Sequence, residues 1–345
     1  MPDYSPTPLT ELPELARELG VGRVFVKDES ARMGLPAFKV LGVTWAVHRV
    51  LAARATVDHV SLIAATDGNH GRAVARMARL LGHGCRVFVP AGVLHPQAEA
   101  AIAAEGAEVV TVAGSYDDAL VQAAGSAMDD PSCVLVQDTA WAGYEEIPGW
   151  IVEGYSTLFA EIDAQLSEAG AHPPGLVAVP VGVGSLAQAA LTHYRSRPTR
   201  RAPAILSVEP EAAACVLACL DRGELVSVPT GFTTMAGLNC GTPSTLAWPF
   251  LRDGLDAAVA VADDEAARAI RDLAVLGVSA GPCGAASLAG ARRALTGNGS
   301  TERRADLALG PTATVILLST EGATANPGAP SPDDRYAATT SPAPA

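Results

Sequence analysis

Basic residues are scarce in this chain, and lysine is the scarcest of them. The 345 residues include 24 lysines and arginines against 37 aspartates and glutamates, which gives a net charge of −13 at pH 7. Lysine occurs only twice, as Lys27 and Lys39, and no segment is rich in arginine or lysine. A nucleic acid or an anionic membrane would find no basic surface to bind. We therefore expect neither as a partner.

Cysteine pairs and long apolar segments are also missing. The six cysteines, at positions 85, 133, 215, 219, 240 and 283, contain no Cys-x-x-Cys pair, and several lie in apolar stretches. This is typical of buried, reduced thiols in a cytosolic protein. No apolar segment is long enough to span a bilayer, and no charged-then-apolar leader opens the chain. These features predict a cytoplasmic protein, and no residue is assigned as a metal ligand.

Aromatic residues make up only 5% of the chain, although 49% of it is hydrophobic, so the core is expected to consist of Ala, Val and Leu. Short apolar runs alternate with Ala-rich helical stretches, as in a strand at 60–65, a helix at 72–81 and a strand at 85–89. This order predicts an α/β fold with mostly parallel sheets covered by helices. We expect a large lobe formed by residues 1–48 and 146–324, a smaller lobe at 49–145, and a disordered tail at 325–345.

Lys39 comes at the start of a predicted helix. Pro36 suits an opening helical turn, and apolar residues follow Lys39 at helical spacing, which places Lys39 in the first turn. The positive end of the helix dipole and partial burial both disfavour an ammonium group there, and a neutral amine is what Schiff-base chemistry needs. Taken alone, the segment fits an ordinary surface lysine better.

A glycine-containing turn follows the predicted strand at 60–65 and opens the next helix. It reads Thr66-Asp67-Gly68-Asn69-His70-Gly71. Backbone N–H groups at such a turn can bind a carboxylate, helped by the helix dipole. A turn that merely needs glycines is the alternative interpretation. Because Asp67 and His70 share one loop, we favour a substrate-binding role for Thr66, Asp67, Gly68 and His70.

A second glycine loop, at 182–187, follows a predicted strand at 176–181. Its glycines allow a close backbone approach to an anion, and Ser185 offers a hydroxyl as an extra donor. The same residues match a Gly-x-Gly-x-x-Ala dinucleotide pattern, and Glu209 ends the next strand, where an acid that binds ribose would lie. The motif alone leaves both a single phosphate and an NAD-dependent dehydrogenase open.

Polar residues also follow two other predicted strands. Asp138 comes after the strand at 133–137 and would face the cleft between the lobes, although it could equally cap the next segment. Ser319 and Thr320 end the last strand, where their hydroxyls could meet a ring nitrogen or simply begin a turn. Ligands of such sheets usually lie beyond the carboxyl ends of the strands, so we expect the site there.

Together these segments resemble the fold-type-II enzymes that depend on pyridoxal phosphate (PLP), the tryptophan synthase β-like group. The similarity is greatest to the diaminopropionate ammonia-lyase family, and it runs from the segment at 26–30 to that at 319–322. Asp67 before Gly-Asn-His-Gly is typical of this branch, as are the segments at 137–141 and 235–241. The resemblance implies a two-lobed architecture with the cofactor between the lobes, held mainly by the large one.

The resemblance also implies a role for each candidate site residue. Lys39 would form the Schiff base with pyridoxal 5′-phosphate, Asp67 and Asp138 would flank the substrate as proton-transfer groups, and members of the family are usually homodimers. The cofactor would be contacted by a larger set: Phe38 beside the ring, Asn69 on the phenolic oxygen, Gly182, Val183, Gly184, Ser185 and Leu186 on the phosphate, and Thr320, or less so Ser319, on the pyridine nitrogen.

The implied reaction is α,β-elimination of ammonia from 2,3-diaminopropionate or a similar small amino acid, giving pyruvate and ammonia. Dehydration of serine or threonine, β-replacement, and a catalytically silent binding module remain open. Two departures from the family pattern bear on this choice. Gly42 is followed by Val43 instead of a second glycine, and Gly281-Pro282-Cys283-Gly284 replaces the usual Gly-Glu-Ser-Gly, which removes a carboxylate.

Overall fold

Two separate sheets organise the protein. The computed structural model describes residues 4–54, 59–66, 68–92, 94–114, 116–196 and 202–325. The larger sheet has six strands in the order β1 (Leu9–Glu11), β2 (Arg23–Asp28), β10 (Thr314–Ser319), β7 (Pro174–Pro180), β8 (Ala204–Pro210) and β9 (Ala257–Val261). All neighbours are parallel except β1 and β2. Every residue of β8 and β10 is buried, as expected for central parallel strands covered on both faces.

Helices cover both faces of the larger sheet, and alternate residues of its strands face opposite layers. Leu176 and Ala178 of β7 pack with α1 (Pro13–Leu19), α10 (Asp263–Val275) and α11 (Pro282–Leu295). Val177 and Val179 pack with α6 (Glu146–Glu168), α7 (Ser185–Arg195) and α9 (Trp248–Gly254). The remaining helical segments are α8 (Cys215–Arg222), α12 (Ser300–Asp306) and the 3-10 turns Glu211–Ala213 and Ala236–Leu238.

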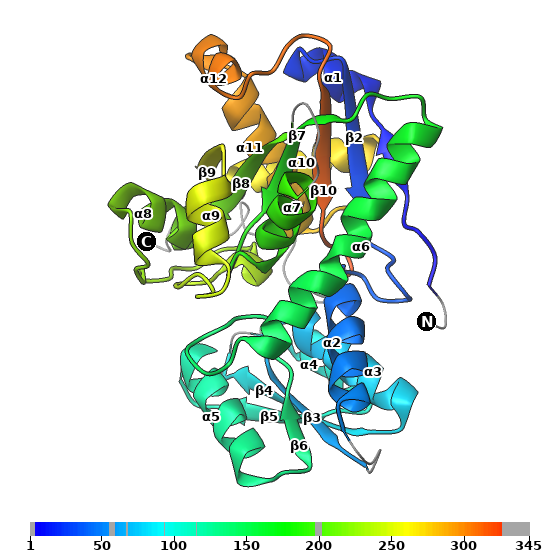
Figure 1. Ribbon diagram of the computed structural model, residues 1–345, viewed down its shortest axis with the longest axis vertical. Coiled ribbons are helices and arrows are strands. Elements are labelled where there is room, and N and C mark those ends of the chain that lie inside the picture. Colours follow the sequence, from blue (N-terminus) through cyan, green and yellow to red (C-terminus); the bar gives the residue numbers. More distant parts are fainter. Residues whose placement is uncertain are drawn as a thin grey trace, which may run out of the picture.

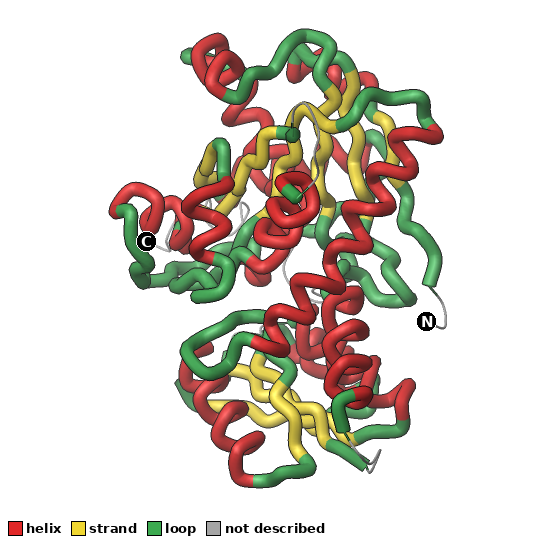
Figure 2. The backbone as a smooth tube through the Cα atoms, in the orientation of Figure 1, coloured by secondary structure: helices red, strands yellow, loops and turns green. Residues whose placement is uncertain are grey.

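The smaller sheet has four parallel strands in the order β5 (Glu108–Val112), β4 (Gly84–Pro90), β3 (Ser61–Ala65) and β6 (Cys133–Leu135). Leu62 and Ala64 face a layer that includes α2 (Val40–Ala52), α3 (Asn69–Leu81) and α4 (Pro96–Ala103). Ile63 and Ala65 face α5 (Tyr116–Asp129) on the other side. Figure 2 shows the strands of this sheet set apart from those of the larger one.

The long helix α6 runs from the larger sheet to the smaller one and packs closely against α2 (Figure 1). Two glycines allow this approach. A Cβ on Gly42 would lie 2.6 Å from the ring of Tyr155, and a Cβ on Gly154 would lie 2.7 Å from the carbonyl oxygen of Leu41. The α2–α6 contact therefore determines where the residue before α2, Lys39, lies relative to both sheets.

The α/β class and the mostly parallel, helix-covered sheets agree with the expectation from sequence. The strands and helices near the amino terminus, β1, α1 and β2, were not predicted, and neither were α8, α9 and α12. The lobe boundaries at 48 and 145 stay a prediction. The predicted disordered tail lies outside the described residues except for Ala325, which is buried. Within the described part of the chain, no helix is long and apolar enough to cross a membrane.

Candidate active site

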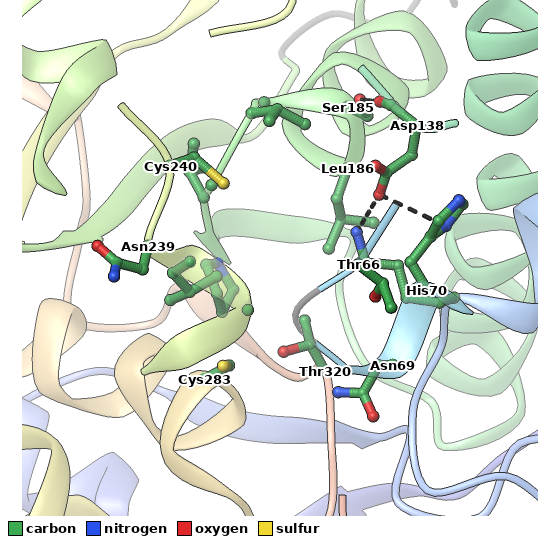
Figure 3. A pocket seen from close by; sticks show the side chains of 18 of the residues that line it. Thr66, Asn69, His70, Asp138, Ser185, Leu186, Asn239, Cys240, Cys283 and Thr320 are labelled. Atoms are coloured by element: carbon green, nitrogen blue, oxygen red, sulfur yellow. Dashed lines mark hydrogen bonds and ion pairs between the residues drawn. The ribbon is translucent and has the colours of Figure 1, made fainter. Parts of the chain in front are cut away.

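A pocket lies where strands of both sheets end. Residues after β3, β6, β7 and β10 line it, together with the starts of α2, α3, α7 and α11 (Figure 3). It therefore forms at the carboxyl ends of parallel strands, where ligands of α/β proteins usually bind. The sequence-predicted residues that line it are Phe38, Lys39, Thr66, Asn69, His70, Asp138, Gly182, Val183, Gly184, Ser185, Leu186 and Thr320. Of the others, Gly68 and Ser319 do not line it, and Asp67 lies outside the described residues.

Lys39 and Asp138 face each other across the pocket. Lys39 is the N-cap residue of α2, directly before the helix rather than in its first turn, and its Nζ donates a hydrogen bond to Oδ2 of Asp138. Burial opposes the charge of Lys39, but the Asp138 carboxylate outweighs burial and raises the pKa of the amine. The prediction of a neutral amine is therefore wrong for this state of the site. It considered burial and the helix dipole, but not a carboxylate 99 positions away in the sequence.

Asp138 is an ionised carboxylate in a buried position. Burial raises its pKa, but the facing Lys39 and then His70 outweigh burial and lower the pKa to about 2. His70 Nε2 donates to the carbonyl oxygen of Val136 at 2.7 Å, so its Nδ1 faces Oδ2 of Asp138 at 3.8 Å. Burial lowers the pKa of His70, which favours the neutral ring. Lys39, Asp138 and His70 thus form one largely buried cluster of ionisable side chains.

The turn at 66–71 is stabilised by one of its own side chains. Oγ1 of Thr66 accepts hydrogen bonds from the N–H groups of Gly68 at 2.9 Å and Gly71 at 3.1 Å. α3 begins at Asn69 rather than at Arg72, so the N–H groups of this turn lie at a helix N-terminus. The substrate-binding role of these residues stays a prediction.

The glycine loop between β7 and α7 provides backbone donors for an anion. Gly184 has φ = 96° at the N-cap of α7, a conformation that favours glycine, and a Cβ on Gly182 would lie 3.0 Å from Sγ of Cys240. The hydroxyl of Ser185 donates to the carbonyl oxygen of Asp138 at 2.6 Å, so it ties this loop to the segment after β6. Its hydrogen is used there in this structure, and its role as an extra anion donor stays a prediction.

Glu209 does not face the pocket. It is fully buried, and its carboxylate accepts hydrogen bonds from the N–H groups of Val216 at 2.7 Å and Leu217 at 2.8 Å, at the start of α8. A carboxylate that caps a helix in this way is not available to a ribose. Glu209 therefore does not serve the loop at 182–187 as the acidic partner that a dinucleotide site would need.

The part of the pocket wall formed by the residues after β10 and at the start of α3 contains hydroxyl and amide groups. Thr320 lines the pocket, whereas Ser319 is fully buried and its Oγ has no hydrogen-bond partner among the described residues. Asn69 Nδ2 donates to Oε2 of Glu321 at 2.6 Å. The ring of Phe38 packs against Tyr155 with the ring centroids 4.8 Å apart. Of the two hydroxyls, Thr320 is thus the one placed to meet a ligand.

Six polar or thiol side chains of the pocket lining were not predicted as site residues: Tyr116, Gln137, Asn239, Cys240, Cys283 and Glu321. Glu321 follows Thr320 directly, so its place after the last strand was the available signal. Gln137 Nε2 donates to the hydroxyl of Tyr116 at 2.6 Å and to the carbonyl oxygen of Ala65 at 3.0 Å. Gln137 thereby continues the sheet through its side chain, which explains why β6 ends at Leu135 although the apolar run predicts a strand to 137.

Comparisons with known proteins agree with this geometry. A family model described as "Pyridoxal-phosphate dependent enzyme" matches residues 1–312. Diaminopropionate ammonia-lyase of Salmonella typhimurium is 39% identical over 79% of this chain and 72% of its own length. The Escherichia coli K12 protein of the same name is 33% identical over 93% and 85%. The crystal structure of the Escherichia coli enzyme in complex with an aminoacrylate-PLP azomethine reaction intermediate superposes with a TM-score of 0.84, at 34% identity, over 93% of this chain and 85% of that one.

The chain belongs to the diaminopropionate ammonia-lyase family of pyridoxal-phosphate-dependent enzymes. Its architecture is that of fold type II, and pyridoxal 5′-phosphate is its cofactor. The pocket suits this group on its own chemistry. An amine at Lys39, a glycine loop at a helix N-terminus and a hydroxyl at Thr320 match the aldehyde, the phosphate and the ring nitrogen of the cofactor.

Proposed function

We propose that the protein eliminates ammonia from 2,3-diaminopropionate, or from a similar small β-substituted amino acid, and releases pyruvate and ammonia. The observation that carries this proposal is the pairing of Lys39 with Asp138 in one pocket that the glycine loop also lines. An amine to hold the cofactor and a buried carboxylate to move a proton lie within direct contact. The names and the identities of the relatives support the same reaction.

PLP, when bound, accepts the electron pair that is left when a proton leaves Cα of the substrate. Lys39 would hold the cofactor through its side-chain nitrogen, and the glycine loop at 182–186 would hold the phosphate by backbone N–H groups. The α2–α6 contact helps to position Lys39, because Lys39 directly precedes α2. Orientation of this kind is a major part of the catalytic effect.

Asp138 is suited to proton transfer because its environment changes with Lys39. While Lys39 is charged, it keeps the pKa of Asp138 at about 2. Whenever the Lys39 nitrogen is uncharged, burial is left as the main effect, and it raises the pKa of the carboxyl. Asp138 then becomes a better base for the Cα proton, and in its protonated form it can supply a proton to the leaving amine.

Asp67 would do the same on the other side of the substrate, an assignment that rests on the sequence. The two enantiomers of an α-amino acid present the Cα proton to opposite faces of the plane that holds the reacting bonds. Two carboxylates on opposite faces would therefore allow both enantiomers to react. Each aspartate would serve one enantiomer as the base.

A substrate panel tests the proposed function. The PLP-loaded protein is incubated with each enantiomer of 2,3-diaminopropionate, with serine and with O-acetylserine, and pyruvate and ammonia are measured. We expect diaminopropionate to give pyruvate and two equivalents of ammonia at the highest rate. A preference for serine would instead indicate a dehydratase, and one for O-acetylserine a β-replacement enzyme. Tight PLP binding without turnover of any amino acid would indicate a silent binding module.

We also propose a cytoplasmic homodimer. All six cysteines are free thiols, which suits a reducing compartment. The dimer rests on the family resemblance. Light scattering on the purified protein measures its molar mass in solution, and a value equal to that of one chain would contradict the dimer.

A further inference from the structure

Glu321 joins the starts of three segments that form the pocket. Its Oε2 accepts the hydrogen bond from Asn69 Nδ2 at 2.6 Å, and its Oε1 accepts one from the N–H of Cys283 at 3.0 Å, in the first turn of α11. Its main chain pairs with Ala37, two residues before Lys39. Glu321 is 2% exposed, so these contacts are made away from water.

Both carboxyl oxygens of Glu321 act as acceptors of N–H groups. Burial raises the pKa of Glu321 overall, and the two N–H donors and the charge of Lys39 offset part of that rise. A Cβ on Gly281 would lie 3.0 Å from Oε1, so the glycine leaves room for the carboxylate. The segment at 281–284 brings no carboxylate of its own to the start of α11. Glu321 supplies one there.

Each oxygen of the Glu321 carboxyl group accepts an N–H, and a carboxylate oxygen can accept but not donate. It can therefore bind only the N–H end of the Asn69 amide, and a rotation of the amide by 180° would set two oxygens against each other. Figure 3 shows the amide nitrogen of Asn69 on the side of Thr320, with the amide oxygen pointing away. One hydrogen of Nδ2 bonds Glu321, and the second is left for a ligand in the pocket.

We propose that Glu321 is a positioning residue that fixes the orientation of the Asn69 amide, so that Asn69 presents an N–H to the phenolic oxygen of PLP. The inference rests on PLP as the cofactor and deepens the proposed function, but it does not depend on which amino acid reacts. The phenolic oxygen is an acceptor, so a flipped amide would face it with an oxygen and weaken cofactor binding.

The variant Glu321→Gln tests this inference, because a neutral amide at 321 can bond either end of the Asn69 amide. We expect its dissociation constant for PLP to rise about tenfold, the effect of losing one charged hydrogen bond. We also expect the long-wavelength absorbance band of the bound cofactor to shift in position and in its pH titration. Glu209→Gln is the matched control, since Glu209 is an equally buried, helix-capping glutamate outside the pocket. It should change neither readout.

The exchanged pair Asn69→Asp with Glu321→Gln separates positioning from a structural role. The new amide at position 321 can donate to the new carboxylate at position 69, which restores the contact and the thermal stability of the apoprotein. The double variant therefore also tests the proposal if Glu321→Gln alone does not fold. It leaves residue 69 without an N–H for the phenolic oxygen, so PLP affinity should stay at least about tenfold weaker. Wild-type affinity and absorbance in the exchanged pair, or in Glu321→Gln, would overturn the proposal.

Discussion

Two clusters of buried charged side chains in the described part of the chain differ in how completely their polar atoms are used. The first, the N-terminal ion cluster, consists of Lys27, Glu29, Arg32 and Glu161. It joins β2 and the loop after it to α6 and to residues 4–7. The second, the pocket cluster, consists of Lys39, His70 and Asp138. Both remove charges from water, and the second lines the pocket described above, whereas none of the four residues of the first does.

Every donor of the N-terminal ion cluster has a partner. The three N–H groups of Lys27 bond Thr7 O, Glu161 and Gln165, and the guanidinium of Arg32 bonds Glu29, Glu161, Thr7 and Ser5 O. In the pocket cluster, the hydrogen bond that the Lys39 ammonium makes to the described residues goes to Asp138, and His70 Nδ1 has no hydrogen-bond partner among them. Removing one partner from a fully satisfied buried cluster destabilises a fold, whereas buried groups with unused capacity facing a cavity mark a candidate reactive site.

The substitution Lys39→Ala, in the pocket cluster, should have the largest effect on activity. It removes the nitrogen that holds the cofactor, so turnover of diaminopropionate should fall at least about 10⁴-fold. The long-wavelength absorbance that borohydride abolishes in the wild type should be absent. Lys27→Met is the control, because Lys27 is the only other lysine and lies in the N-terminal ion cluster. The folded fraction of Lys27→Met should keep the long-wavelength absorbance. If that absorbance were lost, the separation of the two clusters would be contradicted.

Arg32→Met should act on stability instead of on chemistry. The change leaves the buried carboxylates of Glu29 and Glu161 without their shared cation, which costs about 3–5 kcal/mol for a broken buried pair. Urea denaturation of the apoprotein measures this loss. The PLP absorbance per folded molecule should stay as in the wild type. A variant of normal stability, or one that folds but binds no PLP, would show that this cluster has another role.

Features that depend on a local segment could be predicted from the sequence, and contacts between distant segments could not. Continuous apolar runs predicted the central strands, and the glycine loops and Lys39 predicted most of the pocket, because these features are local. The partner of Lys39 could not be predicted from its own segment, since Asp138 approaches only through the fold. Glu321 reads as an ordinary turn residue after β10, and nothing near Glu161 in the sequence indicates that it meets Lys27 and Arg32.

Asp67→Asn and Asp138→Asn test which aspartate removes the Cα proton from each enantiomer of the substrate. If each aspartate serves one face of the substrate, each variant should lose about 100-fold in turnover of one enantiomer of diaminopropionate and much less for the other. Steady-state rates with the separate enantiomers measure this. Equal losses on both enantiomers in either variant would contradict the assignment to two faces, while leaving the proposed reaction in place.

The smallest effect is expected in the pH dependence of stability. Lys39 lowers the pKa of Asp138 from an ordinary value of 3.8 to about 2, so the native protein binds this proton less readily than the unfolded chain does. A lowered pKa contributes stability that is present above pH 3.8 and is lost as the pH falls to about 2. The contribution is about 2 kcal/mol in the apoprotein.

This contribution can be isolated by denaturing wild type and Asp138→Asn apoproteins in urea between about pH 6 and pH 2. The stability advantage of the wild type should narrow as the pH falls through this window, because Asp138 becomes protonated and its pairing with Lys39 is lost. Asp306→Asn, at an exposed position, is the control and should show no such narrowing. Binding of PLP should remove most of the effect as well, since Lys39 then no longer presents a full charge to Asp138. If the stability difference between wild type and Asp138→Asn stayed constant down to about pH 2, protonation of Asp138 would not affect stability. The pairing of Asp138 with Lys39 would then not be the source of the lowered pKa.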